Sequence, residues 1–218
     1  MCARSERIDG MEKFTAVCGV AAPLSQANID TDVIMPKQFL KGITRDDLAR
    51  GLFYDLRFDA QGVERDEFVL NRPEYRQSRF LVVGPNFGCG SSREHAVWGL
   101  VQWGIRAIIG SSFASIFHDN CFRNGVLPIA LPPQQAAALQ SVCTVPGRSI
   151  LRVDLNEQSI ELHDGSLLRF AIDPMRRDDL LNGRDAVAST LRFADDIEAF
   201  ERGHWTRWPW LRPQAAGR

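Results

Sequence analysis

The residues best suited to chemistry form one short stretch, Gly88 to His95, which reads Gly-Cys-Gly-Ser-Ser-Arg-Glu-His. A continuous apolar run at residues 79–84 comes before it and predicts a buried strand. We expect a helix to follow, from about Ser92 to Trp103. Helix starts present free backbone N–H groups, and glycines let the backbone approach a ligand. The stretch therefore predicts a pocket for a carboxylate or a phosphate.

Three neighbouring side chains, Ser91, Ser92 and Arg93, would add two hydroxyls and a fixed cation to that pocket. Arginine suits a carboxylate because it makes two parallel hydrogen bonds to it. A plainer interpretation is equally open at this point. Ser91 and Glu94 have the S-x-x-E spacing of a capping box, so Ser91 would only cap the helix and Arg93 would be solvated.

Other glycine-turn motifs do not fit this stretch. A dinucleotide fingerprint needs a third glycine where this chain has Arg93, a phosphate-binding Walker loop needs Gly-Lys-Ser/Thr, and a nucleophile elbow needs Gly-x-Ser-x-Gly. The five cysteines are far apart, and none forms a Cys-x-x-Cys pair. An iron–sulfur cluster usually needs several closely spaced thiolates, so we expect this chain to bind none alone.

Composition sets the class of protein. The chain has 218 residues with 44% hydrophobic and 24% charged residues, which is ordinary for a globular domain. Its formal net charge of −1 provides no long-range field for nucleic acid or an anionic membrane. No segment approaches the roughly 20 apolar residues that span a bilayer, and the acidic start lacks a signal-peptide core. We expect a cytoplasmic protein with no nucleic-acid or membrane partner.

The elements around the stretch predict how it is positioned. Strands are expected at 79–84, 105–109 and 126–131, with helices at 92–103 and 112–123, the second capped by Ser112. This alternation predicts parallel strands with right-handed crossovers. Upstream we expect a strand at 14–20, a turn at 28–32, a helix at 44–52 and a charged surface loop at 55–79.

The last third has a different pattern. Strands are predicted at 150–155, 159–163 and 167–172, with Asp164-Gly165 as a hairpin turn. Asp173-Pro174 opens a helix that Gly183 ends, and 195–202 forms another. We predict a disordered lead-in at 1–12, one domain at 13–203 and a tail at 204–218. That Trp-rich tail is either a strap packed on the surface or a docking segment for another chain.

Several motifs resemble one protein family. Residues 86–95 resemble the signature of the swivelling domain of the aconitase superfamily. Residues 28–41 are similar to the N-terminal signature of bacterial 3-isopropylmalate dehydratase small subunits. Further similar blocks lie at 113–128 and 170–183, so the resemblance runs from about Lys13 to Phe200. It implies an α/β fold: a swivelling β/β/α domain with a parallel strand–helix core plus a C-terminal hairpin and helices.

The resemblance also implies a reaction. The family isomerises 2-isopropylmalate and 3-isopropylmalate in leucine biosynthesis by removing and re-adding water. By motif position Ser91 would be the catalytic base, Ser92 and Arg93 would bind a substrate carboxylate, and Asp32 would match an active-site aspartate. A serine ionises only where positive potential holds its alkoxide, which helix N–H groups and Arg93 would supply.

The resemblance further implies a partner. The family uses a 4Fe-4S cluster, which a large subunit must supply because the cluster cysteines are missing here. Phe39 and Leu40 are candidates for contact with the isopropyl group of this dicarboxylate substrate, and equally for the core. Two alternatives stay open. One is a related hydro-lyase for citraconate, methylmalate, dimethylmalate or homoaconitate, and the other is a non-enzymatic anion-binding module.

Overall fold

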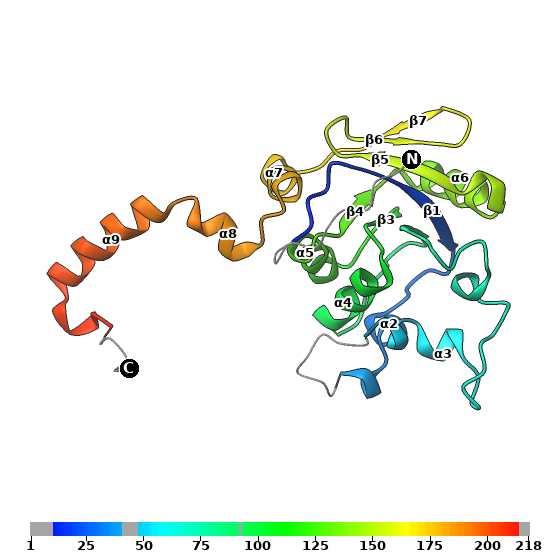
Figure 1. The fold of residues 1–218 in the computed structure, drawn as a ribbon, viewed down its shortest axis with the longest axis horizontal. Coiled ribbons are helices and arrows are strands. Elements are labelled where there is room, and N and C mark those ends of the chain that lie inside the picture. The colour runs from blue at the N-terminus through cyan, green and yellow to red at the C-terminus, as the bar shows by residue number, and fades with distance from the viewer. Residues whose placement is uncertain (1–10, 41–47, 92, 214–218) are drawn as a thin grey trace.

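The computed structural model describes residues 11–40, 48–91 and 93–213. These residues form a seven-stranded sheet in the order β4-β3-β2-β1-β5-β6-β7 (Figure 1). The strands are β1 (Ala16–Leu24), β2 (Phe80–Val83), β3 (Ala107–Gly110), β4 (Leu127–Ala130), β5 (Ile150–Asp154), β6 (Ser159–Glu161) and β7 (Leu167–Arg169). The predicted α/β class is confirmed. Most of the predicted lead-in and the first half of the predicted helix at 44–52 lie outside the described residues.

The parallel half of the sheet is its buried centre. β1 pairs with β2, β2 with β3 and β3 with β4, all parallel, as the alternating pattern predicts. Every residue of β2 and β3 is buried because helices cover both faces of the sheet. α4 (Glu94–Trp103) and α5 (Ser115–Arg123) pack on one face, and α6 (Pro133–Cys143) packs on the other. No pattern in the sequence had predicted α6.

The antiparallel half begins at the other side of β1. β5 pairs antiparallel with β1, and β6 and β7 continue as the predicted hairpin. α7 (Pro174–Asn182) follows, and its predicted ends are confirmed. Asp173 accepts hydrogen bonds from the backbone N–H groups of Met175 and Arg176, and Gly183 closes the helix in the left-handed conformation at φ +66°.

The segment at 55–79 is exposed over much of its length, as its charges predicted, but it also contributes residues to the interior. Arg57 and Asn71 are both buried there. The Arg57 guanidinium lies 4.5 Å from the centre of the Trp103 ring and donates to Asn71 Oδ1 at 3.2 Å and to the Leu52 carbonyl at 3.3 Å. A charge can be buried when it is paired in this way. The segment contains α3 (Tyr54–Arg57) and the 3-10 turn η2 (Val69–Asn71), and it follows α1 (Thr31–Ile34), η1 (Lys37–Phe39) and α2 (Leu48–Gly51).

The C-terminal elements extend away from the body. They are α8 (Ala186–Leu191), α9 (Ala194–Arg207) and η4 (Pro209–Leu211). Figure 1 shows α9 standing clear of the sheet and of the helices packed on it. The Trp-rich segment is therefore not the packed strap of the first interpretation, and Trp210 is 72% exposed. No helix in the described ranges is both long and apolar enough to cross a bilayer. The division at 12/13 and 203/204 stays a prediction.

Candidate functional site

The two segments that carry the signatures lie side by side. One follows β1 and the other follows β2, and the carboxyl ends of neighbouring parallel strands meet at one edge of the sheet. Backbone hydrogen bonds join them from Asn28 N to the Pro85 carbonyl (2.9 Å), from Gly88 N to the Ile29 carbonyl (2.8 Å), and from Thr31 N to the Cys89 carbonyl (2.9 Å). The sheet thus builds one site from two distant parts of the chain.

The turn between β2 and α4 needs its glycines. Gly88 and Gly90 have φ values of +75° and +86°, which side chains rarely adopt. A Cβ atom on Gly88 would also overlap the Phe117 ring. Asn86 takes φ +57°, and its side-chain amide donates to Asn28 Oδ1 at 2.8 Å. The turn is therefore held tightly against the segment that follows β1.

An ion pair joins two of the predicted site residues. Arg93 donates from Nη1 to Oδ1 of Asp32. The Arg93 side chain is 17% exposed and that of Asp32 is 42% exposed, so the pair lies at the surface of the site. The Thr31 hydroxyl donates to the Ser91 carbonyl, which fixes the backbone just before Arg93. The guanidinium is thus oriented before any ligand arrives.

Ser91 does not cap the helix. α4 begins at Glu94, its N-cap residue is Arg93, and that residue's side chain makes no capping hydrogen bond. Ser91 stands two residues too early, and Glu94 accepts a hydrogen bond from Asn124 Nδ2 at 2.8 Å instead of folding back. The capping-box interpretation is therefore wrong. Ser91 is exposed beside the start of the helix.

The chain matches known proteins over most of its length. Residues 11–134 match the family model of the aconitase C-terminal domain, and residues 187–214 match the model of the C-terminal domain of the 3-isopropylmalate dehydratase small subunit. The chain is 52% identical over 202 residues to 3-isopropylmalate dehydratase small subunit 1 of Mannheimia succiniciproducens, covering 93% of this chain and 100% of that one. The chain belongs to the family of 3-isopropylmalate dehydratase small subunits.

Two further relatives support the family. The small subunit of Phenylobacterium zucineum is 51% identical over 201 residues, which cover 92% of this chain and 98% of that protein. A crystal structure of 3-isopropylmalate dehydratase from Methanocaldococcus jannaschii superposes with a TM-score of 0.61 at 26% identity. It covers 85% of this chain and 99% of that one. The enzyme of this family is a hydro-lyase of leucine biosynthesis.

The remaining predicted site residues are less closely joined to the turn. Ser92 lies outside the described residues. Phe39 and Leu40 are partly buried and pack against the core. The centre of the Phe39 ring is 5.0 Å from that of Tyr54, and the ring lies over Gly51. The structure thus places Phe39 with α2 and α3 and packs Leu40 against the core, whereas Arg93 pairs with Asp32.

The described residues do not offer the ligands of a metal cluster. Across residues 11–40, 48–91 and 93–213, no three His, Cys, Asp or Glu side chains come together as a metal site. Burial raises the pKa of the Cys121 thiol well above its usual value and that of Cys143 to about 12. Cluster ligands are thiolates, so these two buried thiols do not fit that role.

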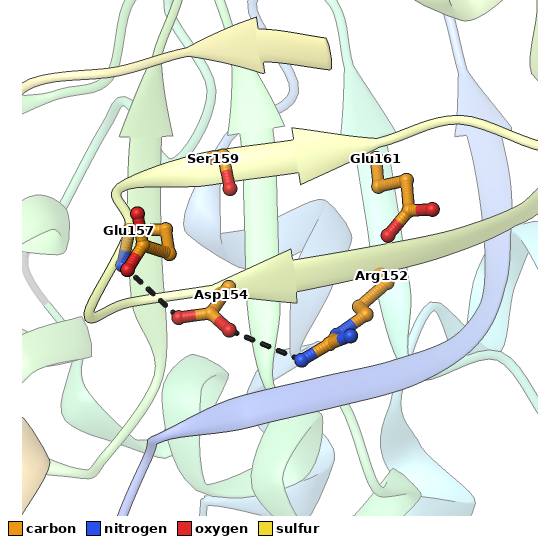
Figure 2. A pocket seen from close by; sticks show the side chains of 5 residues that line it. All are labelled: Arg152, Asp154, Glu157, Ser159 and Glu161. Carbon is orange, nitrogen blue, oxygen red and sulfur yellow. Dashed lines mark hydrogen bonds and ion pairs between the residues drawn. The ribbon is translucent and has the colours of Figure 1, made fainter. Parts of the chain in front are cut away.

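A polar hollow lies away from the candidate site. Figure 2 shows it between β5 and β6, where Asp154 accepts from Arg152 Nη2 at 3.2 Å and from the backbone N–H of Glu157 at 3.0 Å. Asp154 pairs with Ala16 at the start of β1, whereas the site follows the end of that strand. The hollow therefore lies near the opposite end of β1 from the site.

Apart from Arg93 and Asp32, the side chains that join the two segments were not predicted from the sequence. Thr31 stands inside the signature at 28–41, yet nothing in its type marks the hydrogen bond to the Ser91 carbonyl. Asn28 and Asn86 both stand in signature motifs, and both take a left-handed φ of +57°. Asparagine is enriched in that conformation, so residue type was the available signal. Pairs such as these become visible only when the segments are placed together.

Proposed function

We propose that this chain is the catalytic small half of a two-subunit hydro-lyase that isomerises 2-isopropylmalate and 3-isopropylmalate. One observation carries the proposal: the turn after β2 and the segment after β1 meet, so that Arg93 pairs with Asp32 beside an exposed Ser91. A cation, a carboxylate and an accessible hydroxyl are the groups that a malate-type acid needs for binding and proton transfer.

Ser91 is the proposed base. Its hydroxyl would take a proton from the carbon next to a substrate carboxylate and return it in the reverse step. An alkoxide is stable here only if positive potential surrounds it. We propose that the backbone N–H groups at the start of α4 and the neighbouring Arg93 supply that potential. The loss of the capping role supports this assignment because it leaves the hydroxyl available.

Arg93 and Ser92 are the proposed carboxylate binders, and Asp32 orients Arg93. A guanidinium held from one side by a carboxylate keeps other N–H groups for a ligand. Phe39 and Leu40 remain candidates for the wall that meets the isopropyl group. Their packing on the core would give that wall a fixed position.

The partner is proposed to be a large subunit that carries the 4Fe-4S cluster. The relatives are named small subunits, which implies a second, larger chain. The described residues of this chain do not provide a cluster's ligands. We therefore propose that the active site forms at the interface of the two chains. The cytoplasmic location stays a prediction from the sequence.

Anaerobic reconstitution tests the proposal. The small subunit alone should not convert 3-isopropylmalate, and mixing with the cluster-bearing large subunit should start turnover. Ser91→Ala should lower kcat by about 100-fold or more, the usual effect of losing a general base, without weakening subunit association. Ser141→Ala, an exposed serine on α6, is the matched control and should leave kcat unchanged. Unchanged turnover in Ser91→Ala would refute the base assignment.

Substrate comparison tests the choice of acid. The specificity constant kcat/KM should be highest for isopropylmalate and lower for citraconate, methylmalate, dimethylmalate and homoaconitate. A higher kcat/KM for one of those acids would instead assign the chain to the hydro-lyase that acts on that acid. Tight binding of such acids by the small subunit alone, with no turnover in the mixture, would instead indicate an anion-binding module.

A further inference from the structure

The C-terminal arm, residues 184–213, contains none of the proposed site residues. It leaves the body after α7 and contains α8, α9 and η4. The structure describes every residue of α8 and α9, and none of them is buried. A helix in water gains most of its stability from packing an apolar face, so this arm lacks its main source of stability.

One side of α9 is apolar. Phe193, Ile197, Phe200 and His204 follow one another at spacings of four, three and four residues, which places them along one helix face. Phe200 is 69% exposed, and its ring stacks on His204 with centres 5.4 Å apart. The opposite side carries acids and bases. Beyond the helix, the Trp208 and Trp210 rings add apolar area, with centres 5.3 Å apart.

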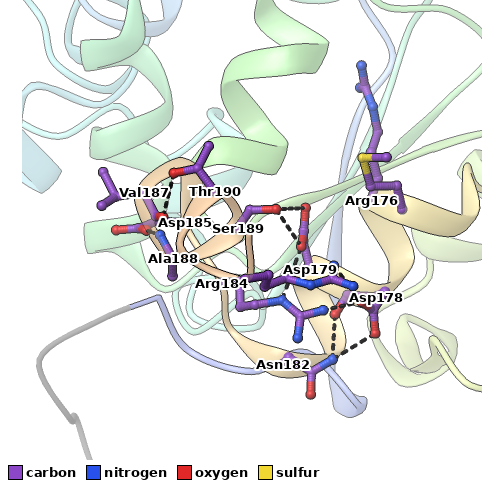
Figure 3. Close-up of polar contacts among 12 residues, drawn as sticks. Arg176, Asp178, Asp179, Asn182, Arg184, Asp185, Val187, Ala188, Ser189 and Thr190 are labelled. Atoms are coloured by element: carbon purple, nitrogen blue, oxygen red, sulfur yellow. Dashed lines mark hydrogen bonds and ion pairs between the residues drawn. The ribbon is translucent and has the colours of Figure 1, made fainter. Parts of the chain in front are cut away.

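The start of the arm is held firmly to the body (Figure 3). Arg184 pairs with Asp178 and with Asp179, the latter at 3.2 Å, and Ser189 donates to Asp179 at 3.2 Å. Arg192 reaches back to Asp178 at 3.2 Å. The direction in which the arm leaves is thus set by side chains, whereas its apolar side remains exposed to solvent.

We propose that the arm is a docking segment whose apolar side lies in a groove of the large subunit. This inference rests on the proposed function for the existence of that large chain. The family models favour this occupant, because residues 187–214 match a model described for the small subunit, separate from the aconitase model at 11–134 that includes the catalytic turn. The arm is therefore a feature of proteins in which this domain is a separate subunit.

Length argues against pairing between two copies of the arm. α9 has 14 residues, whereas a self-sufficient coiled coil needs about three to four heptads. A short amphipathic helix with anchors at such spacings instead suits a groove on a larger protein. The aromatic residues Phe200, Trp208 and Trp210 are large side chains of the kind that dominates binding energy at interfaces.

The arm starts near the beginning of β1, and the site lies beyond the end of that strand. Phe14, just before β1, donates its backbone N–H to the Leu180 carbonyl at 2.9 Å, so α7 ends near the start of β1. The site follows the end of β1. The arm therefore contributes affinity for the large subunit without touching the substrate, as a second contact point does in a bivalent complex.

Two neighbouring substitutions test the docking role. Phe200→Asp places a charge on the apolar side of α9, and Ala199→Asp places the same charge on another side. The cognate large subunit is titrated anaerobically into each variant, with the dissociation constant measured by sedimentation and turnover measured in parallel. Phe200→Asp should raise the dissociation constant about 30-fold, as for a hot-spot residue, while kcat at saturating large subunit stays unchanged. Ala199→Asp should match the wild type.

The outcomes separate this inference from the proposed function. Sedimentation reports association even if the mixture does not isomerise isopropylmalate, so docking is judged independently of activity. Equal dissociation constants for Phe200→Asp and the wild type overturn the docking role, as does failure of the wild-type chains to associate. Loss of self-association in Phe200→Asp, with unchanged affinity for the large subunit, would assign the arm to a second copy instead.

Discussion

At the scale of single residues, the candidate site depends on an ion pair between side chains from different segments. Arg93 and Asp32 are 61 positions apart in the chain, yet their charged groups meet at the surface of the site. Asp32 holds one N–H group of the guanidinium, which orients the others. Arginine differs here from lysine, because its planar fork binds a carboxylate with two hydrogen bonds while a lysine makes a point contact.

This pairing predicts coupled effects on substrate binding. Arg93→Lys should raise the KM for isopropylmalate about tenfold, since a two-bond contact becomes a single one. Asp32→Asn should raise it less, because Arg93 remains but is no longer oriented. The double variant should show less than the sum of the two free-energy changes, as expected for residues in contact. Asp55→Asn, an exposed position on α3, is the control, and strict additivity would contradict the pairing.

At the scale of elements, the turn between β2 and α4 determines how closely the backbone approaches the site. Gly88 combines a left-handed backbone with a neighbouring ring, Phe117 of α5, that leaves no room for a methyl group. The turn, the helix that follows it and α5 are thus packed as one unit. A change at this glycine disturbs all three.

Gly88→Ala should destabilise the protein by about 2–5 kcal/mol, since a left-handed alanine costs roughly 1–2 kcal/mol and overpacking adds about 1–3 kcal/mol. The control is Gly165→Ala, in the hairpin, which has a similar φ of +80° and open space around it. That variant should lose only the backbone part. Urea unfolding measures both free energies of unfolding. Equal losses in the two variants would show that the Phe117 ring moves aside without destabilising the protein, which would contradict the prediction.

The elements also show what the sequence can and cannot predict. β2, β3 and α7 were predictable because their signals are local: continuous apolar runs for the strands, and Asp173-Pro174 with Gly183 for the helix. The predicted cap at Ser112 is wrong because tertiary contact overrides it. The Ser112 hydroxyl accepts from the Asn86 N–H at 2.9 Å, and Ala114 is the N-cap residue of α5.

The candidate site was predictable in part for the same reason. Ser91 and Arg93 stand in a short stretch whose residue types predict a pocket for an anion, whereas the role of Ser91 as a base is implied only by the family resemblance. The ion pair with Asp32 forms because β1 and β2 are neighbours in the sheet. No local sequence pattern predicts that strand pairing. Arg57 was missed because burial of a charge depends on partners such as Asn71, and charged residues are ordinarily expected outside.

At the scale of the whole molecule, a polar cluster joins α5 to α7. Because the arm begins directly after α7, this cluster connects the core to the helix from which the arm leaves. Arg176 lies 3.2 Å from Nδ1 of His118 and donates to Asp119 at 2.7 Å. Burial, and next the positive charge of Arg176, lower the pKa of His118 below its usual value, although Asp119 opposes them. The imidazole is therefore harder to protonate in the folded chain than in the unfolded one.

This shift predicts the direction of a pH effect on stability. As pH falls through 6.5, the ordinary histidine value, the unfolded chain binds a proton that folded His118 resists, so the free energy of unfolding decreases. Urea unfolding between about pH 7.5 and about pH 5.5 should show this decrease. His118→Gln should make the decrease smaller. An unchanged slope in His118→Gln would contradict the prediction.

The position of β1 in the sheet has a consequence for the order in which the chain acquires its shape. β1 pairs with β2 on one side, but its other neighbour, β5, comes from the last third of the chain, where Ile150 pairs with Val20. During synthesis on the ribosome, this first strand waits with one edge open until β5 has emerged. Open edges attract other chains, and such distant pairings form slowly. A nascent chain stalled before Ile150 is thus exposed to aggregation.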